Sequence, residues 1–145
     1  MNLLDGLFTG LVIGILLGIP AMITEALNPT SRMPLLMDVE TFWGRKLSEG
    51  GVIFWSAVVH LGMSTLYGSF VPLLVLQGIL PPHLPLHGLL LYSVGFNLSM
   101  GFIALPIVGF GLFGRREGDF VWLELLLTHL LYGVAYWALA HLFFL

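Results

Sequence analysis

Residues 3–26 read LLDGLFTGLVIGILLGIPAMITEA, an apolar stretch long enough, at ~1.5 Å per residue, to cross a hydrocarbon layer of ~30 Å. Three further stretches of similar length and character follow at Val52–Gln77, Leu86–Leu112 and Phe120–Leu145. The sequence therefore predicts an all-α fold. Residues 1–145 are expected to form a single transmembrane domain, a four-span helical bundle in contact with the lipid bilayer.

The composition agrees with a membrane location. Hydrophobic residues make up 58% of the chain and charged residues 9%, whereas soluble domains have about 25% charged residues. The net charge is −3, and no basic segment indicates nucleic-acid binding. The chain has no cysteine, which excludes disulfides and thiolate chemistry. Because no complete catalytic set is present in the sequence, we expect a protein that is not an enzyme.

The basic residues predict how the chain is threaded. All five lie in the first and third predicted loops: Arg32, Arg45, Lys46, Arg115 and Arg116. Cytoplasmic loops of membrane proteins carry the excess of lysine and arginine. We therefore expect loops 28–51 and 113–119 in the cytoplasm and both termini outside, in a cytoplasmic (inner) membrane.

The first loop carries an amphipathic pattern. Between Met33 and Leu47 apolar residues recur near helical spacing, and Pro34 suits a first helical turn. This pattern predicts a short interfacial helix in the plane of the lipid headgroups. Gly50 and Gly51 are then expected to form the turn into the second span.

Glycine recurs at every fourth position of the first span: Gly6, Gly10, Gly14 and Gly18. Residues four apart share one face of a helix, and small residues let helices approach closely in lipid. This glycine zipper predicts a helix-packing face. Its partner is either another span of the same chain, or another transmembrane subunit, or a second copy through self-association.

The two halves of the chain share a short pattern. His60 in the second span is followed seven residues later by Tyr67, and His129 in the fourth span is followed by Tyr136 at the same offset. The first and third spans each contain a proline as well. The pattern predicts two repeated helical hairpins related by an axis along the membrane normal.

Prolines are expected to kink the first and third spans, at Pro20 and Pro106. Each proline lacks the N–H that would donate to the carbonyl four residues earlier. The carbonyls of Leu16 and Phe102 are therefore predicted to need another donor inside the membrane.

The histidines within the spans, His60 and His129, are functional candidates because an ionisable side chain in lipid needs a partner. In one interpretation each donates an N–H to a carbonyl freed by proline. In the other they bind a cofactor, as axial ligands of haem b or as a ligand of chlorophyll. Spacing alone leaves both interpretations open.

Three histidines near the outer surface are candidate metal ligands: His83, His87 and His141. Three imidazoles would suit zinc or copper. However, the prolines around the first two oppose their sharing a helical turn, and the prediction is that no metal binds there.

Several motifs resemble those of a known family. They are residues 34–39 followed by Gly44, His60, the glycine-rich stretch 106–114, and residues 129–133. They look like the recurrent motifs of the YagU-like group of four-helix bacterial membrane proteins, a family of unknown function. The resemblance covers nearly the whole chain. It implies a four-span fold in a bacterial inner membrane, without an assigned reaction or site residues.

These observations favour a non-enzymatic accessory or scaffolding subunit that packs against a larger, bioenergetic membrane complex. Two alternatives stay open. One is a bundle that binds haem b or chlorophyll through His60 and His129, and the other is a small-solute transporter whose kinked helices surround a mid-membrane site.

Overall fold

The computed structural model describes residues 2–27, 41–42, 45–107, 109–116 and 118–144. Within these ranges, four helical segments are long and apolar enough to cross a membrane. The prediction of an all-α four-span bundle is thereby confirmed.

Three of the spans are single helices: α1 (Leu3–Leu27), α2 (Glu49–Leu76) and α5 (Val121–Phe143). The first begins with a reciprocal cap. The Asp5 N–H donates to Asn2 Oδ1 over 2.9 Å, and the Asn2 N–H donates to Asp5 Oδ2 over 2.6 Å. Such a pair satisfies amide groups that would otherwise lack a partner at the start of a helix.

The third span is a composite helix. α3 (Leu86–Ser99) continues through the π-helical turn η1 (Met100–Ala104) into α4 (Leu105–Ile107). The first N–H of α4 donates to the Met100 carbonyl, five residues earlier. This widened turn lies just before Pro106, where the normal ladder of hydrogen bonds loses a donor.

The third span ends earlier than predicted. Its helix stops at Ile107 rather than at Leu112. Gly109 and Gly111 adopt positive φ angles of 94° and 74°, which end a helix and which glycine tolerates best. A 3-10 turn, η2 (Leu112–Gly114), then leads towards α5.

Short strands replace part of the predicted interfacial helix. β1 (Thr41–Phe42) pairs antiparallel with β2 (Arg45–Lys46). The prediction of a helix is therefore wrong over these residues. Thr and Phe favour strands, and Gly44, between the two strands, has a low helix propensity. The rest of that prediction, over residues 28–40 and 43–44, falls outside the described residues.

The second span begins before the predicted turn. Ser48 caps α2, and its Oγ accepts from the Gly51 N–H over 3.3 Å. Gly50 and Gly51 thus belong to the first turn of α2 rather than to a separate turn.

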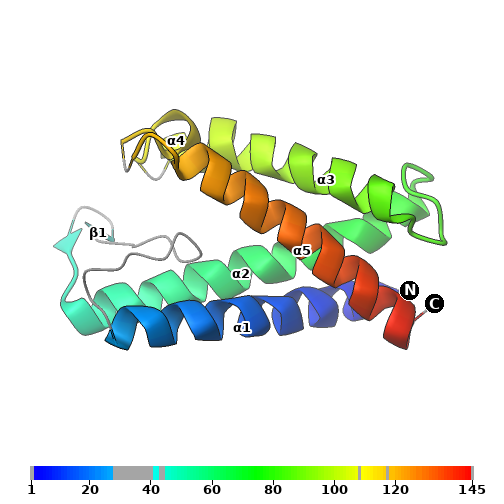
Figure 1. The fold of residues 1–145 in the computed structure, drawn as a ribbon, viewed down its shortest axis with the longest axis horizontal. Coiled ribbons are helices and arrows are strands. Elements are labelled where there is room, and N and C mark those ends of the chain that lie inside the picture. The colour runs from blue at the N-terminus through cyan, green and yellow to red at the C-terminus, as the bar shows by residue number, and fades with distance from the viewer. Residues whose placement is uncertain (1, 28–40, 43–44, 108, 117, 145) are drawn as a thin grey trace.

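The helices form two antiparallel hairpins, α1 with α2 and α3 with α5 (Figure 1). Both termini lie at one end of the bundle, and the strands, α4 and η2 lie at the other. All the basic residues in the described ranges therefore belong to segments at the end opposite the termini. The presence of two hairpins agrees with the predicted architecture. That the two hairpins are repeats related by an axis along the membrane normal stays a prediction.

Glycines bring α1 and α2 into close contact. A Cβ added at Gly6 would lie 2.6 Å from the Gly68 carbonyl oxygen, and one added at Gly14 would lie 2.7 Å from Ser64 Cβ. At Gly10 and at Gly68 an added Cβ would overlap the facing backbone. The glycine row of α1 therefore faces α2 of the same chain.

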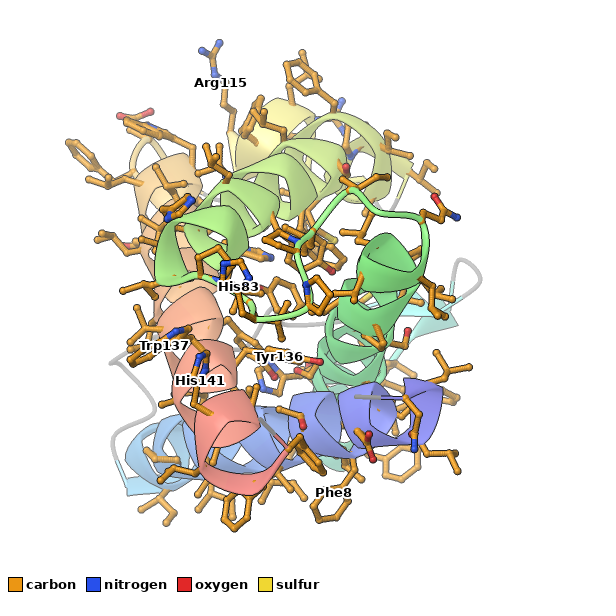
Figure 2. The ribbon with its side chains drawn as sticks, turned by 90° about the vertical axis from the view of Figure 1, so that its right-hand side faces the viewer. Phe8, His83, Arg115, Tyr136, Trp137 and His141 are labelled. Carbon is orange, nitrogen blue, oxygen red and sulfur yellow. The ribbon has the colours of Figure 1, made fainter. Side chains whose placement is uncertain are left out.

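The chain has four tyrosines, and all of them lie where the two hairpins meet; we call Tyr67, Tyr92, Tyr132 and Tyr136 the tyrosine cluster. Figure 2 shows Tyr136 inside the bundle, while Phe8 of α1 points outward and is 63% exposed. An outward face of this kind suits contact with lipid.

Each tyrosine of α5 donates to a backbone carbonyl of the first hairpin. The Tyr132 hydroxyl donates to the Gly10 carbonyl over 3.3 Å, and the Tyr136 hydroxyl donates to the Gly68 carbonyl over 3.1 Å. Both hydroxyls are buried, so these bonds satisfy polar groups that have no access to water.

The remaining two tyrosines connect α2 with α3. The Tyr92 hydroxyl donates to the Tyr67 carbonyl over 2.7 Å, and the Tyr67 and Ser93 hydroxyls share a hydrogen bond of 2.6 Å. The rings of Tyr67 and Tyr132 have centroids 5.1 Å apart. The tyrosine cluster therefore links both helices of the second hairpin to the first.

The close contact of α1 with α2 makes Gly10→Ala a sharp test. The added methyl would push against the α2 backbone, and we expect a loss of about 1–3 kcal/mol in the free energy of unfolding. Gly62→Ala is the control, because nothing lies within 4 Å of a Cβ added there and alanine has the higher helix propensity. Equal stability of the two variants in detergent would contradict this packing.

Candidate functional site

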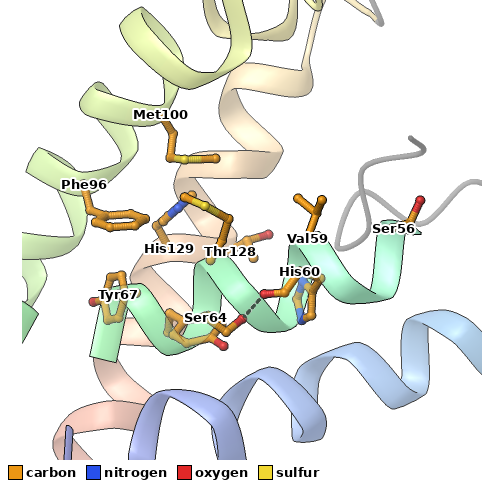
Figure 3. A pocket seen from close by; sticks show the side chains of 11 residues that line it. Ser56, Val59, His60, Ser64, Tyr67, Phe96, Met100, Thr128 and His129 are labelled. Atoms are coloured by element: carbon orange, nitrogen blue, oxygen red, sulfur yellow. Dashed lines mark hydrogen bonds between the residues drawn. The ribbon is translucent and has the colours of Figure 1, made fainter. Parts of the chain in front are cut away.

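A pocket of about 90 Å³ lies between the two hairpins (Figure 3). α2, the composite third span and α5 all contribute to its wall. The two mid-span histidines, His60 and His129, both line it, so the fold brings together the two residues that the sequence singled out.

His60 is held by α1. Its Nε2 lies 3.0 Å from the Gly14 carbonyl oxygen. A carbonyl oxygen can only accept, so Nε2 carries the proton in this contact. Gly18 provides the space, because a Cβ there would lie 3.1 Å from both Cδ2 and Nε2 of the imidazole.

The carbonyl that accepts from His60 is not one of the two that the prolines leave without a donor. A bond from His60 to a backbone carbonyl of the first span is present, but it reaches Gly14 rather than Leu16. The reason is the rotation of α1. The glycine face is turned towards α2, whereas Leu16 lies on an outward face and is 58% exposed.

His129 is held by its own helix. Its Nδ1 lies 2.7 Å from the Leu125 carbonyl oxygen, so Nδ1 carries the proton and Nε2 of the neutral ring keeps its lone pair. The ring packs against Phe96, with centroids 5.5 Å apart. In this contact His129 therefore does not donate to a carbonyl freed by proline. Phe102 lies in η1, where the π-helical turn rearranges the hydrogen bonds around the proline.

Two hydroxyl groups of the pocket are anchored in the same way. Ser64 Oγ donates to the His60 carbonyl over 2.6 Å, and Thr128 Oγ1 donates to the Glu124 carbonyl over 2.8 Å. Their protons, like that of His129 Nδ1, point back to the helix that carries them. Apart from these few polar groups, the wall of the pocket is mostly apolar.

The pocket does not fit the predicted macrocyclic cofactors. Ligand pockets for larger molecules have volumes of ~300–1,000 Å³, and this one has about 90 Å³. In addition, Nε2 of His60 is engaged by the Gly14 carbonyl rather than directed at a shared metal. Haem b or chlorophyll on His60 and His129 would require the hairpins to move apart.

The fold does not bring the three outer histidines, His83, His87 and His141, together. All three are described, and no three His, Cys, Asp or Glu side chains gather anywhere among the described residues. His141 Nδ1 instead donates to the Trp137 carbonyl over 2.9 Å, and its ring packs on Trp137 (Figure 2). His83 lies in the turn before α3, and His87 lies in the first turn of that helix.

From the sequence alone Met63 and Met100 are most simply packing residues, and sequence reasoning did not place them at a site. Met63 follows His60 by three residues, a spacing that places both on one helix face and that could have identified it. Met100 had no comparable signal, because its position depends on how η1 joins α3 to α4.

The chain matches no family model, no curated protein and no solved structure. The resemblance to the YagU-like group therefore stays a prediction.

The bond from His60 to Gly14 predicts a graded response to substitution. His60→Gln keeps an N–H donor and should be mild, whereas His60→Phe removes the donor and should cost about 0.5–1.5 kcal/mol of unfolding free energy. Chemical unfolding in detergent measures both, with His83→Phe in the exposed turn as the control. A glutamine variant as unstable as the phenylalanine variant would contradict a role as hydrogen-bond donor.

Proposed function

We propose that this multi-pass membrane protein binds a small solute between its two hairpins and belongs to the class of small-solute transporters. The observation that carries this proposal is the position of His60 and His129, which come from different hairpins and line the same pocket. Many transporters bind substrate near the bilayer midplane at the interface between two structural repeats.

The chemistry of the wall narrows the solute to a small cation. Ser64, Thr128 and His129 each use their proton on a backbone carbonyl. The rest of the wall is mostly apolar, so the lone pair on Nε2 of His129 is its clearest attraction for a positive charge. A volume of about 90 Å³ admits an ion or a few waters rather than a metabolite.

The hypothesis of an accessory subunit has less support. The glycine face of α1 is one of the features that favour it, and α2 of the same chain covers that face. The apolar residues that remain exposed on α1, such as Leu4 and Phe8, suit lipid as well as a partner. Partner subunits, self-association and the absence of enzymatic activity stay predictions.

We propose that the basic loops face the cytoplasm, in a bacterial inner membrane as the resemblance to the YagU-like group implies. The support is the position of β2 and of residues 115–116 at the end of the bundle opposite the termini.

The threading can be tested by cysteine labelling, for which the cysteine-free chain gives no background. Asn2 and Ser48 are both exposed and lie at opposite ends of the bundle. In intact cells, a membrane-impermeant maleimide should label Asn2→Cys and not Ser48→Cys. After the membrane is permeabilised, both should react. Labelling of Ser48→Cys in intact cells would reverse the assigned orientation.

The pocket can be tested by filling it. Val59 lines the pocket and its neighbour Val58 does not, yet both are 41% exposed on α2. A cation present at 100 times its Kd should stabilise the protein by ~2.7 kcal/mol, which raises Tm by several degrees. We expect a shift in the wild type and in Val58→Phe, but not in Val59→Phe. The panel consists of Na⁺, K⁺, NH₄⁺, Ag⁺ and Cu⁺ salts.

If no cation raises the Tm of Val58→Phe more than that of Val59→Phe, the result would contradict a solute site in this pocket.

A further inference from the structure

We infer that the pocket is a site for a soft monovalent metal ion, Cu(I), with the thioethers of Met63 and Met100 and Nε2 of His129 as its ligands. The inference rests on the proposed function and names its solute. Three helical segments supply the ligands: α2, η1 and α5.

The donor atoms select a soft ion. Thioether sulfur and imidazole nitrogen favour Cu(I) over hard ions such as Mg²⁺ and Ca²⁺, which prefer oxygen ligands. The chain has no cysteine, so methionine and histidine are its soft donors. Two of the methionines line the same pocket as two of the histidines.

The charge of the wall selects a monovalent ion. No Asp or Glu is present among the described residues that line the pocket. Burial of a divalent ion without anionic ligands is costly, because the penalty for removing an ion from water rises steeply with its charge. A single positive charge surrounded by neutral sulfur, nitrogen and hydroxyl donors is the least costly metal occupant.

His129 is arranged as a metal ligand. Metal-binding histidines usually donate their other ring N–H to a carbonyl or carboxylate, which fixes the ring and the position of the lone pair. The bond of 2.7 Å from Nδ1 to the Leu125 carbonyl does this. Figure 3 shows His129 and the thioether of Met100 on the same side of the pocket, beside Phe96.

The π-helical turn places Met100 at an irregular point of the third span. Met100 is the first residue of η1, and its carbonyl accepts from a residue five positions later. Turns of this kind inside helices are frequent at functional sites. The turn before Pro106 therefore determines where Met100 lies relative to the pocket.

Anaerobic titration of the purified full chain in detergent tests the inference. Cu(I) is competed against bathocuproine disulfonate, and Ag(I) serves as the redox-inert probe in thermal unfolding. We expect one Cu(I) to be bound in the pocket. Met63→Leu, Met100→Leu and His129→Gln should each weaken binding by about tenfold or more, and the double methionine variant should abolish it.

A matched control is available on the same helix. His141 Nδ1 also donates to the carbonyl four residues earlier, over 2.9 Å, but His141 lies outside the pocket. His141→Gln should therefore keep wild-type affinity. Replacing methionine by leucine conserves side-chain volume. Circular dichroism and the Tm without metal would check that each variant folds.

Three results would overturn the copper site: undiminished binding by the double methionine variant, loss of binding in His141→Gln, or Zn²⁺ bound as tightly as Ag(I). Suppose that Ag(I) and Cu(I) do not raise Tm, but another cation does, and that Val59→Phe removes this rise. The copper inference then fails and the proposed solute pocket stands. If every cation changes the Tm of Val59→Phe and Val58→Phe equally, both the copper site and the solute pocket are contradicted.

Discussion

The close approach of α1 and α2 is the constraint on which the rest of the structure depends. A glycine has no side chain to cover its backbone carbonyl, so that carbonyl can accept a second hydrogen bond. Three side chains donate to these glycines: Tyr132 to Gly10, Tyr136 to Gly68, and His60 to Gly14. Helices in lipid gain little from the hydrophobic effect, and interhelical hydrogen bonds and close packing hold them together instead. The glycines contribute to both.

The pocket follows from the size of the side chains between the hairpins. The rings of Tyr67 and Tyr132 fill the space beside it, while Ser64 and Thr128 are too small to do so. The tyrosine cluster therefore holds the hairpins apart at one depth in the membrane. Beside it, where Ser64 and Thr128 face the gap, the pocket remains. His129 is fixed by its own helix rather than by a tyrosine, and its Nε2 is left for the pocket.

The bilayer explains why the fold could be predicted from the sequence, since its thickness dictates the length of each apolar stretch. Other features depend on competition or on tertiary contacts. At 41–42 and 45–46 a near-helical pattern competes with residues that favour strands, and two short strands form. The acceptor of His60 depends on the rotation of α1, which only the packing against α2 decides. The position of Met100 at the pocket could not be predicted, because methionine fits packing roles almost anywhere.

The way the two hairpins are joined bears on how such a site could work. Within the first hairpin, α1 and α2 touch along their backbones through glycine, and they would move as one body. The second hairpin is joined to it by buried apolar side chains and by the tyrosine cluster, whose hydroxyl bonds are each worth about 0.5–1.5 kcal/mol net. Bonds of that strength can exchange one at a time. An ion held by ligands from both hairpins would oppose their separation, and its release would favour it. Such coupling between occupancy and hairpin position is what transport between two sides of a membrane requires.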